Sequence, residues 1–356
     1  MSETSPCLKV KKIHGEKALV LTKKLGISNQ ELEIQRNMQH IYLPLIRQPD
    51  KNELAKLKEQ LPDFKLTTRV FTKKRQKRKT LDQILEKKLP SHLLGNLPHA
   101  LDVIGDIAII EIPPELKTYE RLIGEAILAA HKNVHTVLAK VGAVSGTYRL
   151  REFEIIAGEK KTTTVHKEYG CQYHVDVAKA YFSPRLSHEH KRVASLVQKG
   201  ETVVDLFAGV GPFSVLIAKN NADIKVYAVD INPEAISYLK KNIRLNRVEN
   251  RVIPLLGDAR QVIENRLSGV ADRVIMNLPE KANEFIDAAC RAVKPSGGVI
   301  HYYAFSRLPD TLEDAQQRFS EAVEKTGRTV DAFLTAKTIR ETAPYEWQIV
   351  LDAKIL

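Results

Sequence analysis

The stretch DLFAGVGPFS combines an acid with two glycines directly after a run of apolar residues. Asp205, Gly209 and Gly211 have the spacing D-x-x-x-G-x-G, but Ser214 stands where a dinucleotide fingerprint would carry its third glycine. Asp230 ends the next apolar run, where its carboxylate could accept hydrogen bonds from two ribose hydroxyls. An acid in front of the loop repels a pyrophosphate, but it suits a ligand that carries positive charge. These residues therefore predict a cationic nucleoside ligand rather than a dinucleotide.

S-adenosylmethionine fits this description, because it has an ammonium, a sulfonium and a ribose but no phosphate. Any Rossmann-like domain has a glycine turn after its first strand, so the prediction depends on the whole series of strand ends, which continues with Gly257 and Asp258. Open α/β sheets bind ligands at the carboxyl ends of their strands. The expected S-adenosylmethionine site consists of Asp205, Phe207, Gly209, Gly211, Asp230, Ile231, Asn232, Asp258, Ala259 and Asn277.

The fourth apolar run ends in Asn277-Leu278-Pro279. Rossmann-fold methyltransferases that modify nitrogen atoms of bases often carry N-P-P-Y or D-P-P-Y here, where the Asn and backbone carbonyls grip the base edge and the aromatic ring stacks on the base. This chain has N-L-P-E, so the stacking residue is absent from its usual place. We expect Asn277 and Pro279 to bind the substrate; the alternative is that Asn277 only caps its strand.

A sheet must bring these residues together. From about Lys179 onward, apolar runs alternate with helical patterns, in the order TVVDLFAG, KVYAVD, RVIPLLGD, DRVIMNLP and GGVIHYYA. Continuous apolar strands separated by helices predict an α/β fold with a doubly wound parallel sheet covered on both faces. The last two strands, around TVDAFLTAKTI and EWQIVLDAKI, are joined by a short connection and predict an antiparallel hairpin at the edge.

Two smaller α/β regions precede this sheet. The first alternates short strands with two amphipathic helices, and the second adds a helix and several strands that end in a hairpin turning at Glu168-Tyr169-Gly170. Between them, KKRQKRK (residues 73–79) has nothing apolar to bury, so it is either a solvated linker or an arm that contacts a partner. The predicted parts are an N-terminal α/β domain (1–72), a basic linker (73–82), a middle α/β domain (83–178) and the Rossmann-like domain (179–356).

The composition indicates a polyanionic partner. The 356 residues contain 55 Lys plus Arg against 43 Asp plus Glu, a net charge of +12, which favours nucleic acid and, second, an anionic membrane surface. Cys7, Cys171 and Cys290 are too few and too widely spaced for a disulfide framework or a cysteine metal site. No segment has the apolar length of a spanning helix or a signal peptide. We expect a soluble, cytoplasmic monomer without a metal and without membrane contact.

From about residue 80 to its end, the chain closely resembles the archaeal and eukaryotic Rossmann-type tRNA (guanine-37 N1)-methyltransferases. The stretches that carry the resemblance are YRLREFEIIAGE, TTVHKEYG, DVAKAYFSPRL, DLFAGVGPFS, VDINPEAI, VIMNLP and GGVIHYY; the N-terminal region and the tail AKTIRETAPYEWQI are also similar. The resemblance implies a class I methyltransferase domain that takes a flipped guanosine beside the anticodon. It also implies tRNA as the partner, with the N-terminal domain touching the outer corner of the L-shaped molecule.

The resemblance further implies roles for individual residues. An Arg at the position of Arg149 and a Glu at the position of Glu189 lie at the base in this family, and Tyr181 and Arg185 line the pocket. Guanine N1 carries a proton at neutral pH, so a base must remove it before the nitrogen attacks the sulfonium methyl. Glu189 is expected to take this proton, while Arg149 donates to O6, where negative charge develops.

Other interpretations stay open. Glu189 could be a solvated charge at a helix start, and Arg149 a sheet-surface cation paired with Glu152 or Glu154. A sister family with the same fold transfers the aminocarboxypropyl group during wybutosine synthesis, but its loop tends to read G-x-G-Y-F where this chain has G-P-F at 211–213. Some archaeal members also methylate a wyosine intermediate on carbon. A tRNA-binding module with a vestigial cofactor site is a further alternative.

Overall fold

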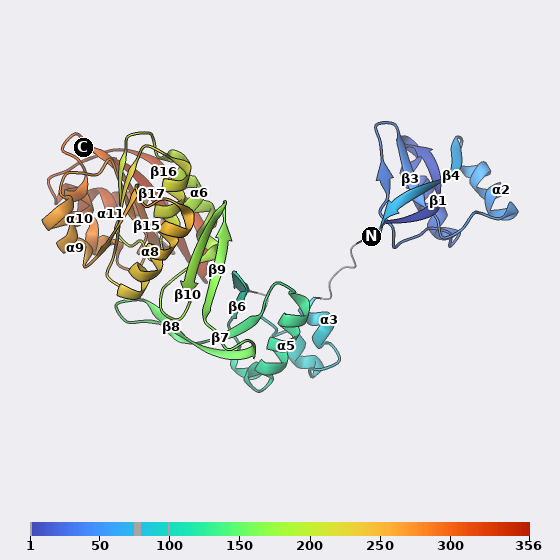
Figure 1. Ribbon diagram of the computed structural model, residues 1–356, viewed down its shortest axis with the longest axis horizontal. Coiled ribbons are helices and arrows are strands. Elements are labelled where there is room, and N and C mark those ends of the chain that lie inside the picture. Colours follow the sequence, from blue (N-terminus) through green and yellow to red (C-terminus); the bar gives the residue numbers. More distant parts are fainter. Residues whose placement is uncertain (1, 75–79, 99) are drawn as a thin grey trace. The chain divides into compact units, whose positions relative to one another are not determined.

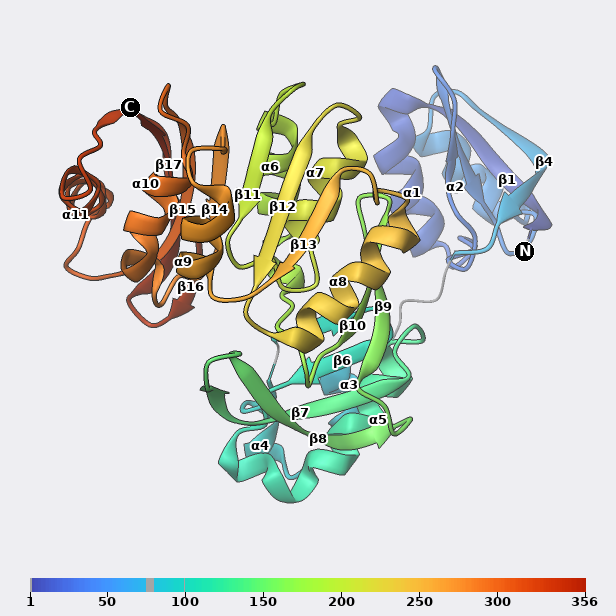
Figure 2. The ribbon, with the colours of Figure 1, turned by 60° about the vertical axis from the view of Figure 1, so that its left-hand side comes forward.

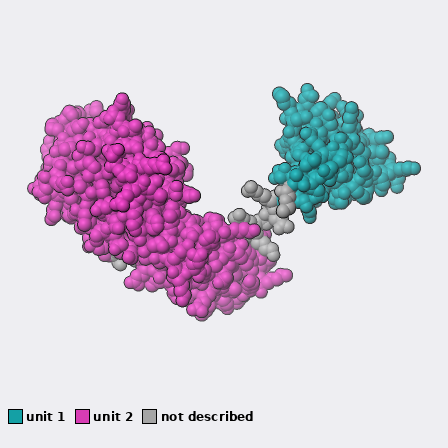
Figure 3. Space-filling model, in the orientation of Figure 1, with its two compact units in different colours: residues 1–78 teal, residues 79–356 magenta. Residues whose placement is uncertain are grey.

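The computed structural model describes residues 2–74, 80–98 and 100–356, and the chain divides into two compact units, residues 1–78 and 79–356 (Figure 3). Most of the basic run expected as a linker or arm, residues 75–79, lies outside the described residues. Within the described ranges, no helix combines the length and the apolar character that crossing a membrane requires.

The first unit is a four-stranded antiparallel sheet in the order β2-β3-β1-β4, with helices packed on it (Figure 1). Alternate residues of β1, such as Leu8 and Val10, are buried against the helices. A capping box begins α2, because Asp50 accepts a hydrogen bond from the Glu53 amide at 2.8 Å and Glu53 accepts one in return. The predicted small α/β module is confirmed. Its elements are β1 (Ser2–Lys11), η1 (Lys12–His14), α1 (Gly15–Lys24), β2 (Gln35–Arg36), β3 (His40–Pro44), α2 (Lys51–Gln60) and β4 (Phe64–Thr72).

The second unit begins with a mixed sheet in the order β5-β6-β7-β8, in which β6 and β7 are parallel. Its core lies between this sheet and helices α3 and α5. Helix α3 begins at Leu81, inside the segment 73–82 that we expected to be a linker, and Thr80 caps it. The elements are α3 (Leu81–Leu85), α4 (Ser91–Leu94), β5 (Leu101–Ile104), β6 (Ile107–Ile110), η2 (Pro114–Tyr119), α5 (Glu120–Ala130), β7 (Thr136–Ser145) and β8 (Leu150–Gly158).

A hairpin of β9 (Thr163–Glu168) and β10 (Cys171–Asp176) follows, with its turn where the sequence predicts it. Tyr169 and Gly170 both have positive φ angles, 44° and 78°, as a two-residue hairpin turn requires. Asn242 of α8 accepts a hydrogen bond from the His174 amide at 2.7 Å, and side chains of β10 enter the core of the next sheet. The hairpin that we expected at the end of the middle domain therefore packs on the Rossmann-like sheet.

The last sheet has the order β13-β12-β11-β14-β15-β17-β16 (Figure 2). Strands β11 to β15 are parallel, and β17 runs antiparallel to both β15 and β16. The predicted doubly wound sheet with an antiparallel edge hairpin is confirmed. Its elements are η3 (Pro184–Leu186), α6 (Ser187–Leu196), β11 (Thr202–Asp205), α7 (Pro212–Asn220), β12 (Lys225–Asp230), α8 (Pro233–Asn246), β13 (Val252–Leu256), α9 (Ala259–Val262), η4 (Ile263–Leu267), β14 (Arg273–Met276), η5 (Ala282–Phe285), α10 (Ile286–Ala292), β15 (Gly298–Arg307), α11 (Leu312–Glu324), β16 (Val330–Ala343) and β17 (Glu346–Ile355).

Both faces of this sheet are covered. Successive residues of β11 point to opposite faces: Val203 joins a core with α6, α7 and α8, and Val204 joins a second core with α9, α10 and α11. Burial on both faces explains why the strands are continuous apolar runs. Because β11 to β14 are parallel, their carboxyl ends meet at one edge, and the predicted site residues gather there.

Candidate active site

A cavity of about 290 Å³ opens at the carboxyl ends of the parallel strands. Most of the predicted site residues line it: Arg149, Tyr181, Phe207, Gly209, Asp230, Ile231, Asn232, Asp258, Ala259, Asn277 and Pro279. Four predicted residues do not line it, namely Arg185, Glu189, Asp205 and Gly211. The structure thus brings most of the nucleoside-binding and base-binding candidates into one cavity and leaves these four outside its lining.

The glycine loop needs its glycines for conformation and space. Gly209 and Gly211 have φ angles of 56° and 93°, in the left-handed region that favours glycine. A Cβ at Gly211 would lie 2.4 Å from Leu239 Cδ1, whereas a Cβ at Gly209 would meet nothing closer than 3.5 Å. Gly211 precedes α7, whose first residue is Pro212 as the sequence predicts. Gly211 therefore packs the loop against α8, and Gly209 lines the cavity.

Asp230 is held at the end of β12 by backbone amides. Its Oδ2 accepts a hydrogen bond from the Gly209 amide at 2.7 Å, and its Oδ1 accepts one from the Asn232 amide at 2.8 Å. Burial raises the pKa of this carboxyl group above its ordinary value, against the effect of the amides. Each carboxylate oxygen has a further lone pair, so Asp230 can still accept from ribose hydroxyls in the cavity that it lines.

Ser214 has a function that a third glycine could not perform. Asp205 is buried beneath the loop, and its Oδ2 accepts a hydrogen bond from Ser214 Oγ at 2.7 Å. Its Oδ1 is buried with no hydrogen-bond partner among the described residues. Burial raises the pKa of Asp205 to about 7, because the ionised carboxylate is unfavourable away from water. A nearby positive charge would compensate for this loss of solvation. An orphaned carboxylate oxygen beneath this loop fits a ligand with a cationic group.

Two further unpartnered polar atoms belong to residues that line the cavity. Among the described residues, Asn277 Oδ1 and Arg149 Nη1 are buried without a hydrogen-bond partner. Arg149 Nη2 donates to Glu280 Oε1 at 3.0 Å, and the guanidinium lies 5.7 Å from the centre of the Tyr181 ring. Arg149 is thus paired with Glu280 rather than with Glu152 or Glu154. A buried acceptor and a buried donor beside an aromatic ring are the groups that bind the edge and face of a base.

Glu189 is buried in the first turn of α6 and is not the solvated charge of the alternative interpretation. Its carboxylate accepts hydrogen bonds from Lys337 Nζ at 2.7 Å, Arg192 Nε at 2.8 Å and the Tyr303 hydroxyl at 3.1 Å. Burial alone would raise its pKa, but the bonds from Lys337 and Arg192 outweigh burial and lower it below the ordinary value. The carboxylate is therefore ionised at neutral pH, and it does not line the cavity.

Arg185 forms an ion pair outside the cavity. Its Nη2 donates to Asp102 Oδ2 at 2.9 Å, in an ion pair that ties η3 to β5 of the preceding sheet. The structure does not bring this side chain to the cavity that Tyr181 lines.

The sequence alone did not single out several residues that line the cavity. Phe285 packs edge-to-face on Phe207 with ring centres 4.9 Å apart, and the Arg260 guanidinium lies 4.1 Å from the Phe285 ring centre. Arg340 Nε donates to Gln348 Oε1 at 3.0 Å on the edge hairpin. Gln348 left a signal in the sequence, because it is a buried polar residue within the apolar strand EWQIVLDAKI. For Phe285 and Arg340 we find no comparable signal.

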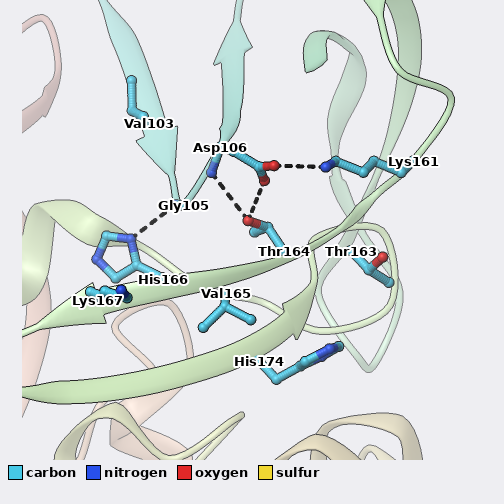
Figure 4. A pocket seen from close by; sticks show the side chains of 10 residues that line it. All are labelled: Val103, Gly105, Asp106, Lys161, Thr163, Thr164, Val165, His166, Lys167 and His174. Carbon is cyan, nitrogen blue, oxygen red and sulfur yellow. Dashed lines mark hydrogen bonds and ion pairs between the residues drawn. The ribbon is translucent and has the colours of Figure 1, made fainter. Parts of the chain in front are cut away.

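A larger hollow of about 680 Å³ lies between the β5–β6 turn and β9 (Figure 4). Asp106 accepts hydrogen bonds there from Lys161 Nζ and Thr164 Oγ1, both at 2.6 Å. None of the predicted site residues lines it. Asp106, Lys161 and Thr164 bind one another there, and the predicted site residues line the smaller cavity instead, so the smaller cavity is the better candidate for chemistry.

Comparison with known proteins identifies relatives along the whole chain. Family models match residues 164–331 (TRM5/TYW2 methyltransferase domain), 81–162 (TYW2 N-terminal domain) and 7–53 (tRNA methyltransferase 5 N-terminal domain). The chain is 48% identical over 267 residues to tRNA (guanine(37)-N(1))-methyltransferase Trm5b of Pyrococcus abyssi, covering 75% of this chain and 78% of that protein. It is 37% identical to Trm5b of Methanocaldococcus jannaschii over 356 residues, covering 98% of both.

The chain is also similar to a solved structure with bound tRNA and to a relative with a different activity. The structure of aTrm5 in complex with tRNALeu has a TM-score of 0.72 and 37% identity, covering 98% of this chain and 99% of that one. A tRNA(Phe) (4-demethylwyosine(37)-C(7)) aminocarboxypropyltransferase of Methanocaldococcus jannaschii is 38% identical over 251 residues, which are 70% of this chain but 96% of that protein. With its full-length match to Trm5b, the chain belongs to the tRNA (guanine(37)-N(1))-methyltransferases of the TRM5/TYW2 family.

Proposed function

We propose that the protein transfers the methyl group of S-adenosylmethionine to N1 of guanosine 37 in tRNA. The observation that carries this proposal is the composition of a single cavity. The ribose acceptor Asp230 ends β12 beside the glycine loop, and Asn277 follows β14 on the other side of β11; Asn277 Oδ1 and Arg149 Nη1 are unpartnered among the described residues. A methyl donor and a base bound by these two sets of residues would share one cavity.

The residues present fit S-adenosylmethionine. Asp230 would hold the ribose, and Ile231 and Ala259 would lie against the adenine. Asp205 does not line the cavity, but the negative charge of its carboxylate beneath the glycine loop would favour the cationic end of the ligand. S-adenosylmethionine supplies a methyl group on a sulfonium, which needs no further activation. The protein's own contribution is to bind the two reactants in register and to exclude water from the cavity.

At the base, the expected roles of Arg149 and Asn277 agree with their atoms. Asn277 Oδ1 can accept from an N–H of guanine, and Arg149 Nη1 can donate to O6. Loss of the N1 proton moves negative charge toward O6, where a preorganised donor stabilises it most. Tyr181, exposed beside Arg149, offers a ring on which the flipped base stacks.

We keep Glu189 as the proposed general base. It is ionised at neutral pH, and its helix neighbour Leu186 lines the cavity. In the structure its carboxylate is engaged by Lys337, so acceptance of a proton requires this contact to open when the base enters. Such tightening and exchange of hydrogen bonds on substrate binding is common at catalytic sites.

Two observations favour methylation over aminocarboxypropyl transfer. Trm5b of Methanocaldococcus jannaschii matches 98% of the chain, including the N-terminal unit, whereas the aminocarboxypropyltransferase matches only 70% of it. The loop also reads Gly211-Pro212-Phe213 rather than G-Y-F. Transfer to tRNA fits the net charge of +12. Our expectation of a cytoplasmic monomer stays a prediction.

Two labels on the cofactor separate the reactions. The protein is incubated with unmodified tRNA transcript and S-adenosylmethionine labelled either in the methyl group or in the carboxyl group, and the tRNA is digested to nucleosides. We expect label from the methyl group alone, in 1-methylguanosine, and none in a transcript with adenosine at position 37. Transfer of the carboxyl label, or methylation at another position, would contradict the proposal.

A further inference from the structure

Asp352 is a buried carboxylate to which the proposed reaction has so far given no role. It lies on β17, directly opposite His301 of β15, and its side chain is 2% exposed. Its Oδ1 lies 2.6 Å from His301 Nδ1 and 3.2 Å from Arg192 Nη2, and Arg192 Nη1 donates to its Oδ2. A carboxylate this deeply buried is costly unless charged and hydrogen-bonding groups compensate for the lost water, so its partners decide what it can do.

The contacts of His301 determine where its proton lies. Arg273 Nη1 lies 2.9 Å from His301 Nε2, and because a guanidinium nitrogen can only donate, Nε2 is the acceptor. Burial lowers the pKa of His301, so the ring is neutral and its Nδ1–H donates to Asp352. Burial alone would raise the pKa of Asp352, but the bonds from His301 and Arg192 outweigh burial and lower it well below the ordinary value. Asp352 is therefore a fixed negative charge.

Arg192 connects this fixed charge to the proposed general base. It lies on α6 one turn after Glu189, and its Nε donates to Glu189 Oε2 at 2.8 Å while its two terminal nitrogens face Asp352. One guanidinium thus bridges two buried carboxylates. Because the guanidinium is planar and rigid, Asp352 at its terminal edge fixes the direction of the Nε–H that Glu189 accepts.

The same arrangement balances charge around Glu189. Its carboxylate is faced by Lys337 from β16, by Arg192 from its own helix and by the Tyr303 hydroxyl from β15. Without a second carboxylate, the whole charge of Arg192 would act on Glu189 and weaken it further as a proton acceptor. Asp352 offsets this charge while it leaves the hydrogen bond from Arg192 in place.

We propose that Asp352 is a positioning residue for methyl transfer and acts through Arg192 on the carboxylate of Glu189. It fixes the guanidinium that directs Glu189, and it offsets the positive charge that would make Glu189 a weaker base. The inference rests on the proposed function, and within it on Glu189 as the group that takes the N1 proton. Asp352 and Arg192 do not line the cavity, so their effect on the reaction is indirect.

Single-turnover methylation of unmodified tRNA transcript by the full-length protein, measured from neutral to alkaline pH, tests the proposal. Asp352→Asn keeps the shape of the side chain but removes its charge, and it should lower the rate at neutral pH by about 10- to 100-fold. The loss should shrink as pH rises toward the ionisation of guanine N1, because solvent then removes the proton. The affinity for S-adenosylmethionine should barely change.

A second background separates positioning from a general loss of structure. In the Glu189→Gln variant the proposed base is already missing, so adding Asp352→Asn should slow methylation further by less than about twofold. A purely structural role of Asp352 would slow methylation by the same factor in both backgrounds.

The matched control is Glu201→Gln. Glu201 belongs to the same polar cluster, where it accepts a hydrogen bond from Arg273 Nη2 at 3.0 Å, but Arg273, His301 and Asp352 separate it from Arg192. This variant should keep the rate and its pH dependence even if it lowers the stability of the protein. If Asp352→Asn does not fold, as judged by the binding of S-adenosylmethionine, Arg192→Lys replaces it and should give the same pattern. An ammonium keeps the charge but lacks the planar fork that holds two carboxylates.

The outcomes separate this inference from the proposed function. An unchanged rate in the Asp352 variant, a loss that does not shrink at high pH, or an equal loss in the two backgrounds would each overturn the positioning role. A near-normal rate of Glu189→Gln by itself would instead contradict Glu189 as the general base. Failure of the unmodified protein to form 1-methylguanosine would contradict the proposed function.

Discussion

At the scale of single residues, the charges around Glu189 govern what its carboxylate can do. Lys337 and Arg192 keep it ionised, which suits a proton acceptor, but their contacts also weaken it as a base. Tyr303, fully buried, donates a further hydrogen bond from the core side. The carboxylate therefore has a defined position before any substrate arrives.

Glu189→Gln tests the role of this carboxylate. Gln keeps the size and much of the hydrogen bonding but cannot accept the proton, so the single-turnover rate of methylation should fall by about two to four orders of magnitude. Affinity for S-adenosylmethionine should barely change. The loss should shrink as pH rises toward the ionisation of guanine N1, since solvent then removes the proton. A near-normal rate at neutral pH would mean that Glu189 only holds α6 against β16.

Arg149→Ala should also slow methylation, but for a different reason. Its unpartnered Nη1 is the expected donor to O6, and loss of one such donor costs about 2.7–4 kcal/mol of transition-state stabilisation. High pH should rescue this variant less than Glu189→Gln, because the charge on O6 still has no partner. Combining the two substitutions should cost less than the sum of their separate effects, as measured by single-turnover rates. Strict additivity would argue that they act at different steps.

Asp205 predicts a pH dependence of stability. Its pKa is about 7 in the folded protein against an ordinary 3.8, so between these values the folded state holds a proton that the unfolded state has released. The free energy of unfolding should therefore decrease as pH rises from about 4 to about 7, and level off above that. The Asp205→Asn variant should lack this decrease. At pH 8 its free energy of unfolding should exceed that of the unmodified protein by at most about 4 kcal/mol. Urea denaturation at pH 5 and pH 8, without cofactor, measures it; an equal difference at both pH values would contradict the assignment.

At the scale of elements, the loop between β11 and α7 places different demands on its two glycines. Gly211 packs against Leu239 of α8, while Gly209 faces the cavity. Helix α8 is in turn tied to the β9–β10 hairpin, because Asn242 donates to the backbone carbonyls of His174 and Val210. The loop, α8 and the hairpin are thus connected through buried contacts.

Two alanine substitutions test whether each glycine of this loop is needed for packing of the protein or for binding of the cofactor. Gly211→Ala adds a Cβ 2.4 Å from Leu239 at a φ of 93°, and should lower the free energy of unfolding by about 2–4 kcal/mol. Gly209→Ala has room in the protein and should cost only about 1–2 kcal/mol for its backbone conformation. It should nonetheless weaken S-adenosylmethionine binding, because Gly209 lines the cavity. Denaturation curves and calorimetry of both variants check this; equal stability losses would refute the packing argument.

At the scale of the whole molecule, the excess of basic residues predicts the salt dependence of tRNA binding. Each phosphate contact that is lost should lower the slope of log K against log salt concentration by about 0.7–0.9. A variant of KKRQKRK with its basic residues changed to Gln or Ser tests whether this run contacts RNA or only connects the units. A changed slope, measured by filter binding between low and physiological salt, indicates contact. An unchanged slope and affinity identify the run as a solvated linker.

Much of the architecture follows from local sequence. Continuous apolar strands between amphipathic helices predict the doubly wound sheet, because only a sheet covered on both faces buries such runs. Parallel strands have their carboxyl ends at one edge of the sheet. Residues at successive strand ends therefore gather there, as do Asp205, Gly209, Asp230 and Asp258. More than 100 residues of chain separate Asn277 from Arg149, so local sequence does not predict that they meet at one cavity. This expectation depended on the resemblance to known methyltransferases.

Tertiary structure alone decided the electrostatic state of these groups. Whether Glu189 is solvated or buried, and which cations hold it, depends on Lys337 and Tyr303, which approach it from strands far along the chain. In the same way, Arg185 pairs with Asp102 instead of entering the cavity. The pairing of Arg192 with Asp352 has no sequence signal. Hydrogen bonds and pKa shifts depend on distances of a few ångströms between distant segments, which periodicity and motif spacing do not specify.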